Sequence, residues 1–348
     1  MANEKDTSCR LGVVGGQAVI EGVMMKHKTR CALAVRMPDG SIAMHNSKFE
    51  SVRVRHKWLG IPILRGVVNF VEMLILSFRM LSISADAFVT EEEEEKPLGK
   101  GVMALLMTLS TLLGVALALG LFFFLPTYLT KGIDYLVGGK LGIWGNIVEG
   151  AVKIAIFVTY LLLVSLMKDI RRTFEYHGAE HKSIFCYEAG EELTVENIKK
   201  HSRFHPRCGT SFLFVMVILS IFVSALPFMP TWENSLLRVL LKLCIFPLIV
   251  GVGYEFIFYA GKHDNVLVRT LSAPGLWMQR ITTREPDDAQ IEIAICALKS
   301  AMPDVFGTEL PELADAVIYE EEVQVYPVPV TADTQDAAPA PASDEDDA

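Results

Sequence analysis

The sequence predicts an α-helical membrane protein with four transmembrane helices and a small cytosolic antiparallel β unit, α+β overall. Of its 348 residues 51% are apolar, and the mean hydropathy is +0.35, which is too high for an ordinary soluble domain. Two uncharged runs, 102–130 and 211–230, have at least about the 20 residues that cross a bilayer core. Two further apolar runs, 147–167 and 236–260, carry charges only toward their ends, so we expect four spans.

Lysine and arginine are distributed unevenly between the segments that would connect these spans. The 131–146 loop contains only Lys131 and Lys140, whereas the 168–210 segment contains Lys168, Arg171, Arg172, Lys199, Lys200, Arg203 and Arg207. Basic connecting segments stay in the cytoplasm. We therefore expect both termini and the 168–210 segment to be cytoplasmic. The polar start of the chain, 1–10, lacks the apolar core of a cleavable signal peptide.

Residues 1–60 are expected to form the cytosolic β-rich unit, since short apolar runs alternate there with turn signals. The clearest hairpin turn is RMPDGS at 36–41, because proline presets one backbone dihedral and glycine accepts a positive φ. Residues 61–96 are expected to form an amphipathic membrane-associated helix followed by an acidic linker. We expect this helix to lie along the membrane or on the bundle, because its narrow polar face carries Arg65, Asn69, Glu72, Arg79 and Asp86.

The rest of the chain divides into three segments. Residues 97–260 hold the four spans and a histidine-rich cytosolic loop, 168–210. Residues 261–329 are expected to form a cytosolic subdomain, in which 287–300 has the apolar spacing of an amphipathic helix. The last residues, 330–348, are rich in Ala, Pro and Asp and are expected to be a disordered acidic tail.

The histidine-rich loop contains a metal-site pattern. Four of the eight histidines fall within 177–205, and His177, Glu180 and His181 have the H-x-x-E-H spacing that one class of zinc hydrolases uses. Residues four apart lie on the same face of a helix. His177 and His181 are therefore candidate ligands of a divalent transition metal, with Zn²⁺ the expected ion.

Local signals predict two helices joined by a turn in this loop. The first covers 173–189 and ends at Gly190, which accepts the left-handed conformation that terminates helices. Thr194 caps a second, shorter helix, and Pro206 forces a break after it. The pair would lie at the inner face of the membrane.

The second element would complete the ligand set. His201, His205 and Cys208 are the alternatives for the third ligand, with Cys208 the softest donor. Glu180 points away from the two imidazoles by about 60° on a helical projection, so it is a candidate general base that acts on a metal-activated water. The alternative is a purely structural role, in which the histidines cap, stack or pair with acidic neighbours.

Two other acidic residues are further candidates. Glu255 lies in an apolar run, where a carboxylate is costly unless it is paired. A salt bridge with Lys262 is the ordinary explanation, and a position facing the metal centre is the functional one. Glu21, together with Gly15 and Gly16, is a weaker candidate for a nest or lid over that centre.

Several strings carry a family resemblance. They are GGQAVIEGVMM at 15–25, AVRMPDGSI at 34–42, YHGAEHK at 176–182, LTVEN at 193–197, SRFHPRCGTSF at 202–212 and the 274–287 segment. Together they resemble the YqhQ-like family, multi-pass bacterial membrane proteins with a domain of unknown function that are often labelled predicted metal-dependent enzymes. The resemblance implies a location in the bacterial inner membrane. It also makes His177, Glu180, His181, His205 and Cys208 the motif positions.

These observations favour a membrane-embedded metal-dependent enzyme, with hydrolytic chemistry and a membrane-proximal peptide or lipid-linked substrate. The main alternative is a non-catalytic scaffold or regulatory protein with a structural or sensing metal site, which would recruit other proteins. A transporter is weaker, since the spans hold few charges unless the protein oligomerises. Membrane lipids are the expected environment, a homo-oligomer or a protein partner fits either hypothesis, and no nucleic acid is expected.

Overall fold

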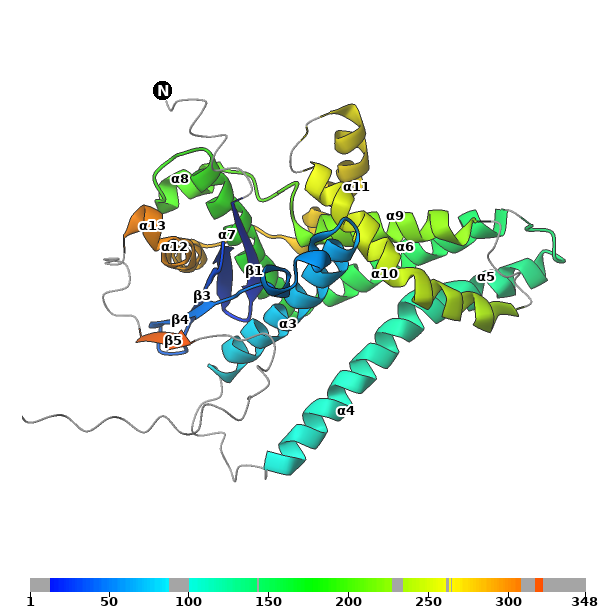
Figure 1. The fold of residues 1–348 in the computed structure, drawn as a ribbon, viewed down its shortest axis with the longest axis horizontal. Helices are drawn as coiled ribbons and strands as arrows, with labels where there is room; N and C mark the ends of the chain where they lie inside the picture. The colour runs from blue at the N-terminus through cyan, green and yellow to red at the C-terminus, as the bar shows by residue number, and fades with distance from the viewer. Residues whose placement is uncertain are drawn as a thin grey trace, which may run out of the picture.

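The computed structural model describes residues 13–87, 100–142, 144–226, 234–260, 263, 265–307 and 317–321. They form a sheet unit and a bundle of long helices that extends away from it (Figure 1). The acidic run of the linker, 91–95, and the tail, 330–348, lie outside the described residues. The protein is mostly helical, as the sequence predicts.

The sheet unit is built on an antiparallel meander. Strands β1 (Val14–Val19), β2 (Gly22–His27), β3 (Arg30–Arg36) and β4 (Ile42–Lys48) pair in chain order. Gly40 has a φ of +88° in the turn between β3 and β4, so the predicted hairpin is confirmed. A fifth strand, β5 (Val317–Glu321), pairs in parallel with β4, and the sequence pattern did not predict it.

Helices cover both faces of this sheet. On one face, Met25 and Met44 pack with Tyr176 of α7 (Lys168–Glu188) and Ile291 of α12 (Asp288–Ala301), beside the short α8 (Val195–Lys200). On the other face, Met24 and Leu33 pack against α3 (Leu64–Asp86). Successive strand side chains point to opposite faces, so two adjacent methionines belong to two different cores. The α12 prediction is confirmed, with Asp287 and Gln290 forming a capping box at its start.

The bundle contains the apolar helices. They are α4 (Lys100–Leu119), η3 (Gly120–Phe124), α5 (Leu125–Leu136), α6 (Trp144–Val164), α9 (Gly209–Ser224) and α10 (Ser235–Ala260), followed by α11 (Val266–Thr282). Among the described residues, four helices are long and apolar enough to cross a membrane: Leu64–Asp86, Thr108–Leu136, Trp144–Val164 and Ser235–Ala260. Three of them overlap expected spans. The fourth expected span, 211–230, corresponds to the 16-residue α9, and part of it, 227–230, lies outside the described residues.

Helix α3 joins the two parts of the molecule. Its first half packs on α10, where Gly66 approaches Tyr254 and Gly251 approaches Ile63 closely. Its second half covers the sheet with Leu76 and Met80. Although α3 has the length and hydropathy of a span, a half-helix that packs on a sheet is not surrounded by lipid, which agrees with its expected place on the bundle. Short segments α2 (Val52–Arg55) and η1 (Lys57–Gly60) precede it.

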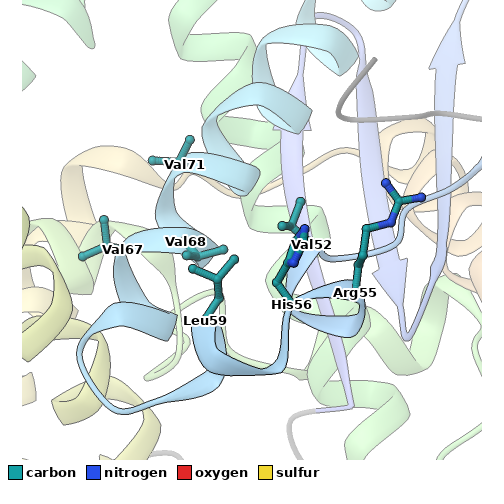
Figure 2. Close-up of a pocket in the computed structure, with 7 residues that line it drawn as sticks. All are labelled: Val52, Arg55, His56, Leu59, Val67, Val68 and Val71. Carbon is teal, nitrogen blue, oxygen red and sulfur yellow. The ribbon is translucent and has the colours of Figure 1, made fainter. Parts of the chain in front are cut away.

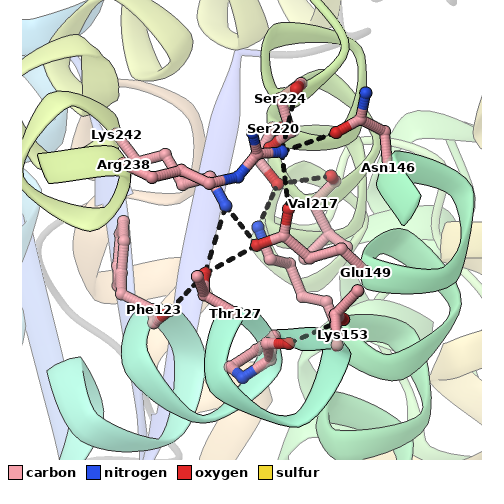
Figure 3. A network of polar contacts seen from close by, with 12 residues as sticks. Phe123, Thr127, Asn146, Glu149, Lys153, Val217, Ser220, Ser224, Arg238 and Lys242 are labelled. Carbon is pink, nitrogen blue, oxygen red and sulfur yellow. Dashed lines mark hydrogen bonds and ion pairs between the residues drawn. The ribbon is translucent and has the colours of Figure 1, made fainter. Parts of the chain in front are cut away.

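A buried ionic network holds the bundle helices together (Figure 3). Glu149 of α6 accepts hydrogen bonds from Thr127 Oγ1 at 2.7 Å, from Arg238 at 3.2 Å and from Lys242. Lys153 donates to Ser220 of α9 at 3.0 Å. The charges that the sequence places near the ends of two apolar runs are therefore paired across α5, α6, α9 and α10, as buried ions in a membrane protein require.

Candidate metal centre

Helix α7 carries the two motif histidines side by side. It runs from Lys168 to Glu188, and the next residues end it at Gly190, whose φ of +75° confirms the expected terminator. The ring centroids of His177 and His181 are 4.4 Å apart. Thr194 caps α8 through a hydrogen bond from the backbone of Asn197, which confirms the second predicted helix.

Backbone carbonyl groups orient both imidazoles. His177 Nδ1 lies 2.8 Å from the oxygen of Thr282, and His181 Nδ1 lies 2.6 Å from the oxygen of Arg203. A carbonyl oxygen only accepts hydrogen bonds, so each Nδ1 carries a proton. In a neutral ring this leaves the Nε2 lone pair free to bind a metal, which is the usual second-shell arrangement of histidine ligands.

Cys208 supplies the third donor at the start of α9. Its sulfur is 3.2 Å from His177 Nε2, and the donor atoms of His177, His181 and Cys208 all lie within 4.8 Å of one another. The segment before it is fixed by Gln279 of α11, which bonds the backbone N–H and C=O of His205, both at 2.7 Å. Three elements, α7, α9 and α11, therefore converge on one point.

The charges of this group depend on each other. Burial raises the pKa of the Cys208 thiol, but the charge and hydrogen bond of His177 outweigh it and hold that pKa well below its usual range. Burial lowers the pKa of His177, and the neighbouring Cys208 more than reverses this and raises it to about 9. The two shifts together favour the thiolate of Cys208, which is the form of cysteine that binds metals.

Glu180 lies against the sheet edge beside the three donors. Burial raises its pKa, against the opposing effect of His177 and His181 and of a hydrogen bond from the backbone N–H of Ala18. Only 5% of the residue is exposed, and its Oε2 has no hydrogen-bond partner in the described part of the chain. A buried carboxylate oxygen without a partner is costly, so a ligand or a water molecule is the expected partner.

The residues fit a zinc ion. Two imidazole nitrogens and one thiolate are the donor types that zinc prefers, and three protein ligands leave a fourth tetrahedral position open, as in catalytic sites. The hydrogen bonds to Thr282 and Arg203 present both rings in the required tautomer. The orphaned Glu180 oxygen provides a carboxylate next to that group.

Comparisons with known proteins agree with the motifs. A model of the family described as "Protein of unknown function (DUF1385)" matches residues 61–304. The chain belongs to this family. It is 34% identical over 299 residues to "Uncharacterized protein YqhQ" of Bacillus subtilis (strain 168), covering 81% of this chain and 89% of that protein. No solved structure matches it. Neither description names an activity, so any functional assignment of this DUF1385 chain rests on its residues.

The other candidate residues lie outside the group formed by the donor atoms of His177, His181 and Cys208, called here the three-donor group. His205 stacks 5.5 Å from His181 and is 3.7 Å from Glu188, while Arg207 pairs with the same carboxylate. His201 pairs with Glu191 at 3.1 Å, close to Cys186, on the far side of the loop. Of the three alternatives for the third ligand, the structure thus brings Cys208 to the two motif histidines.

The two remaining acidic candidates, Glu255 and Glu21, each pair with an arginine. Glu255 pairs with Arg65 and accepts from the backbone N–H of Ile63 at 3.1 Å, whereas the expected partner, Lys262, lies outside the described residues. Glu21 pairs with Arg172 and Tyr176 of α7. It therefore ties the β1–β2 turn to the helix that carries the metal motif.

The carbonyl groups that orient the two imidazole rings could not be predicted from the sequence. Thr282 and Arg203 act through backbone oxygens, which every residue has, so no residue type could have marked them. A cavity of about 420 Å³ lies elsewhere, between α2, η1 and α3, lined mainly by valine and leucine side chains (Figure 2). It contains no part of the three-donor group.

Proposed function

We propose that this DUF1385 protein is a zinc-dependent hydrolase of the bacterial inner membrane, with its site at the cytoplasmic face. His177, His181 and Cys208 would hold the ion, and Glu180 would be the general base. The observation that carries the proposal is the common orientation of the two imidazoles. Both direct Nδ1 at a backbone carbonyl and keep Nε2 for the space they share with the Cys208 sulfur.

The chain's own residues supply the remaining chemistry. Bound zinc would polarise a carbonyl group and acidify water. Glu180 takes the proton of the attacking water at its free Oε2 and passes it to the leaving nitrogen or oxygen as the scissile bond breaks. Burial is the main cause of the raised pKa of this carboxyl, and it shifts the pKa toward pH 7. Such a shift suits a group that accepts and returns a proton.

Elemental analysis of the detergent-purified protein tests the metal directly. We expect about one zinc per chain, and loss of zinc in His177→Ala/His181→Ala and in Cys208→Ala. His263→Ala is the control, because this exposed histidine belongs to neither group of possible donors among the described residues, whereas His201 forms a second such group with Cys186 and Glu191. Glu180→Gln should keep the zinc and fail to complement a deletion strain. Full complementation by Glu180→Gln would favour the non-catalytic scaffold.

A cysteine hydrolase is a second candidate, favoured by the Cys208–His177 pair. Its sulfur is 3.2 Å from the imidazole, it caps a helix N-terminus and its pKa is strongly lowered, as in enzymes that use a thiolate nucleophile. Cys208→Asp separates the two. Aspartate is a zinc ligand and a good N-cap, so a zinc enzyme keeps its metal and part of its activity, whereas a cysteine nucleophile is lost completely.

A further inference from the structure

The outer edge of β1 is open in the described part of the chain. The sheet order is β1-β2-β3-β4-β5, so β1 has a partner on one side only. We propose that this edge binds the backbone of an extended peptide by strand addition and leads the peptide to Glu180. The inference deepens the zinc-hydrolase proposal and rests on it for the cleavage step, because it assigns a peptide as the substrate.

The hydrogen-bond pattern shows which groups of β1 face outward. The oxygen of Glu21 accepts from Arg36 N of β3 at 2.9 Å. Hydrogen-bonded pairs alternate along an antiparallel ladder, so the next residue, Gly22, bonds to β1 instead. Its partner is Val19, and the same alternation turns Gln17 and Gly15 toward β2. The N–H and C=O groups of Val14, Gly16 and Ala18 therefore point away from the sheet.

The position of Glu180 is consistent with that direction. This residue belongs to α7 and not to the sheet, its carboxylate oxygen would lie 2.9 Å from a Cβ at Gly16, and the N–H of Ala18 is among the groups that affect its pKa. The outward N–H and C=O of Gly16 and the outward C=O of Ala18 have no backbone partner among the described residues. One end of the open edge thus meets the proposed general base.

The edge has open space at Gly15 and is approached by Glu180 at Gly16. A Cβ at Gly15 would meet nothing within 4 Å, and Gly16 is close enough to Glu180 that a Cβ there would lie 2.9 Å from its carboxylate oxygen. Gln17 is held on the other face of the sheet by Ser77 of α3. Proteins usually protect an edge strand with lysine, proline or a bulge, and β1 has none of these. Glycines instead allow another backbone to approach.

The carboxylate at the end of the edge selects the substrate class. A peptide paired with Gly16 continues past Ala18 to the unpartnered Oε2 of Glu180, which is 95% buried. Only a chain with repeating N–H and C=O groups can use such an edge, so a lipid-linked headgroup does not. In Figure 1 β1 lies on the side of the sheet toward the bundle.

The test uses the zinc-loaded full-length protein in lipid nanodiscs and a mixture of random decapeptides, with cleavage read by mass spectrometry. The best-cleaved peptide is then methylated at one backbone nitrogen at a time. On one side of the cleaved bond, the effect should alternate along the peptide. Methylation at one set of alternate residues should lower kcat/KM by about tenfold each, the effect of one lost hydrogen bond, whereas methylation at the residues between them should leave kcat/KM unchanged. Uniform tolerance or uniform loss would overturn strand addition.

A cross-linking experiment separates this inference from the hydrolase proposal. Benzoylphenylalanine at Gly15, where space is open, should cross-link the decapeptide, and the same residue at exposed Asp39 in the β3–β4 turn should not. Cross-linking at Gly15 in a protein without zinc would retain the peptide-binding edge and reject the hydrolase. A zinc-bound protein that hydrolyses a lipid amide but neither cleaves nor cross-links peptides would retain the hydrolase and reject the edge.

Discussion

Gly178 is the residue on which the geometry of the metal centre can be tested most directly. It follows His177 on α7 and faces the 283–286 segment. A Cβ at this position would lie 1.9 Å from the backbone oxygen of Arg284 and 3.4 Å from the ring of Pro286. The oxygen would have to retreat by about 1.5 Å to reach an ordinary contact distance. It cannot do so freely, because Arg284 N bonds Phe174 O at 2.8 Å.

The expected cost of Gly178→Ala follows from three effects. Alanine is better than glycine in a helix by about 1 kcal/mol. Overpacking against a fixed backbone costs about 1–3 kcal/mol. Loss of the hydrogen bond to Phe174 costs about 1 kcal/mol more. The net result is a destabilisation of about 1–3 kcal/mol. Since the displaced segment begins next to Thr282, which orients His177, zinc affinity should also fall by about 10–100-fold.

Thermal unfolding in mild detergent and competition for zinc with a fluorescent chelator measure the two quantities. Gly209→Ala is the matched control. Gly209 is also helical and adjacent to a proposed ligand, Cys208, but a Cβ there meets nothing within 4 Å. The control should be neutral or slightly stabilising and keep its zinc affinity. If Gly178→Ala behaves like Gly209→Ala, α7 does not approach the 283–286 segment closely and the carbonyl that orients His177 is misplaced.

Three further predictions concern other parts of the molecule. Lys242→Met should destabilise the bundle by about 3 kcal/mol or more, because it removes a buried partner of Glu149; unfolding in increasing SDS measures this, and an unchanged midpoint would contradict the network. Burial, followed by the charge of Lys28, lowers the pKa of His27 from 6.5, so the unfolded chain binds the proton more tightly than the folded one. The free energy of unfolding should therefore fall as the pH drops from about 7 through the folded pKa. His27→Gln should remove that slope in pH-dependent melting curves. After metal chelation, alkylation at pH 7 followed by peptide mapping should label Cys208 in preference to Cys186, because burial raises the pKa of Cys186 to about 11. Added zinc should protect Cys208 from the reagent. Equal labelling of the two cysteines would argue against a thiolate at Cys208.

Local signals were sufficient to predict several elements. The turn at Gly40, the end of α7 at Gly190 and the cap of α8 at Thr194 each depend on the conformation of one or two residues, which the residue type determines. The capping box of α12 is similar, since Asp287 and Gln290 are three residues apart. Such features can be inferred without any knowledge of the rest of the fold.

Contacts between distant parts of the chain could not be predicted from such local signals. β5 pairs with β4 across more than half of the sequence, and pairing of this kind leaves no local pattern. Arg65 reaches Glu255 because α3 packs on α10, and the sequence does not indicate that packing. Glu72 of α3 is only 1% exposed and accepts from Ser51 and Val52, so the polar stripe of this helix is in part a pairing surface and not a solvated one.

The ligand set shows the same limit at the level of the site. Spacing alone placed His177 and His181 on one face of α7, but it left the third ligand open among His201, His205 and Cys208, with His205 or Cys208 preferred. The choice depends on how α9 is placed, and that placement depends on Gln279 of α11, which binds the backbone before Cys208. A residue more than 70 positions away thus decides which donor meets the motif.

This arrangement connects the proposed chemistry to the bundle of apolar helices. His177, Glu180 and His181 belong to a helix that is packed into the core of the sheet unit, whereas Cys208 begins α9 of the bundle. An ion held by His177, His181 and Cys208 would link the sheet unit to the bundle, and neither of these two parts alone contains all three ligands. Lys153 of α6 donates to Ser220 of α9, so the position of Cys208 depends on how the bundle helices pack. The proposed ligand set is therefore complete only when the sheet unit and the bundle are packed together.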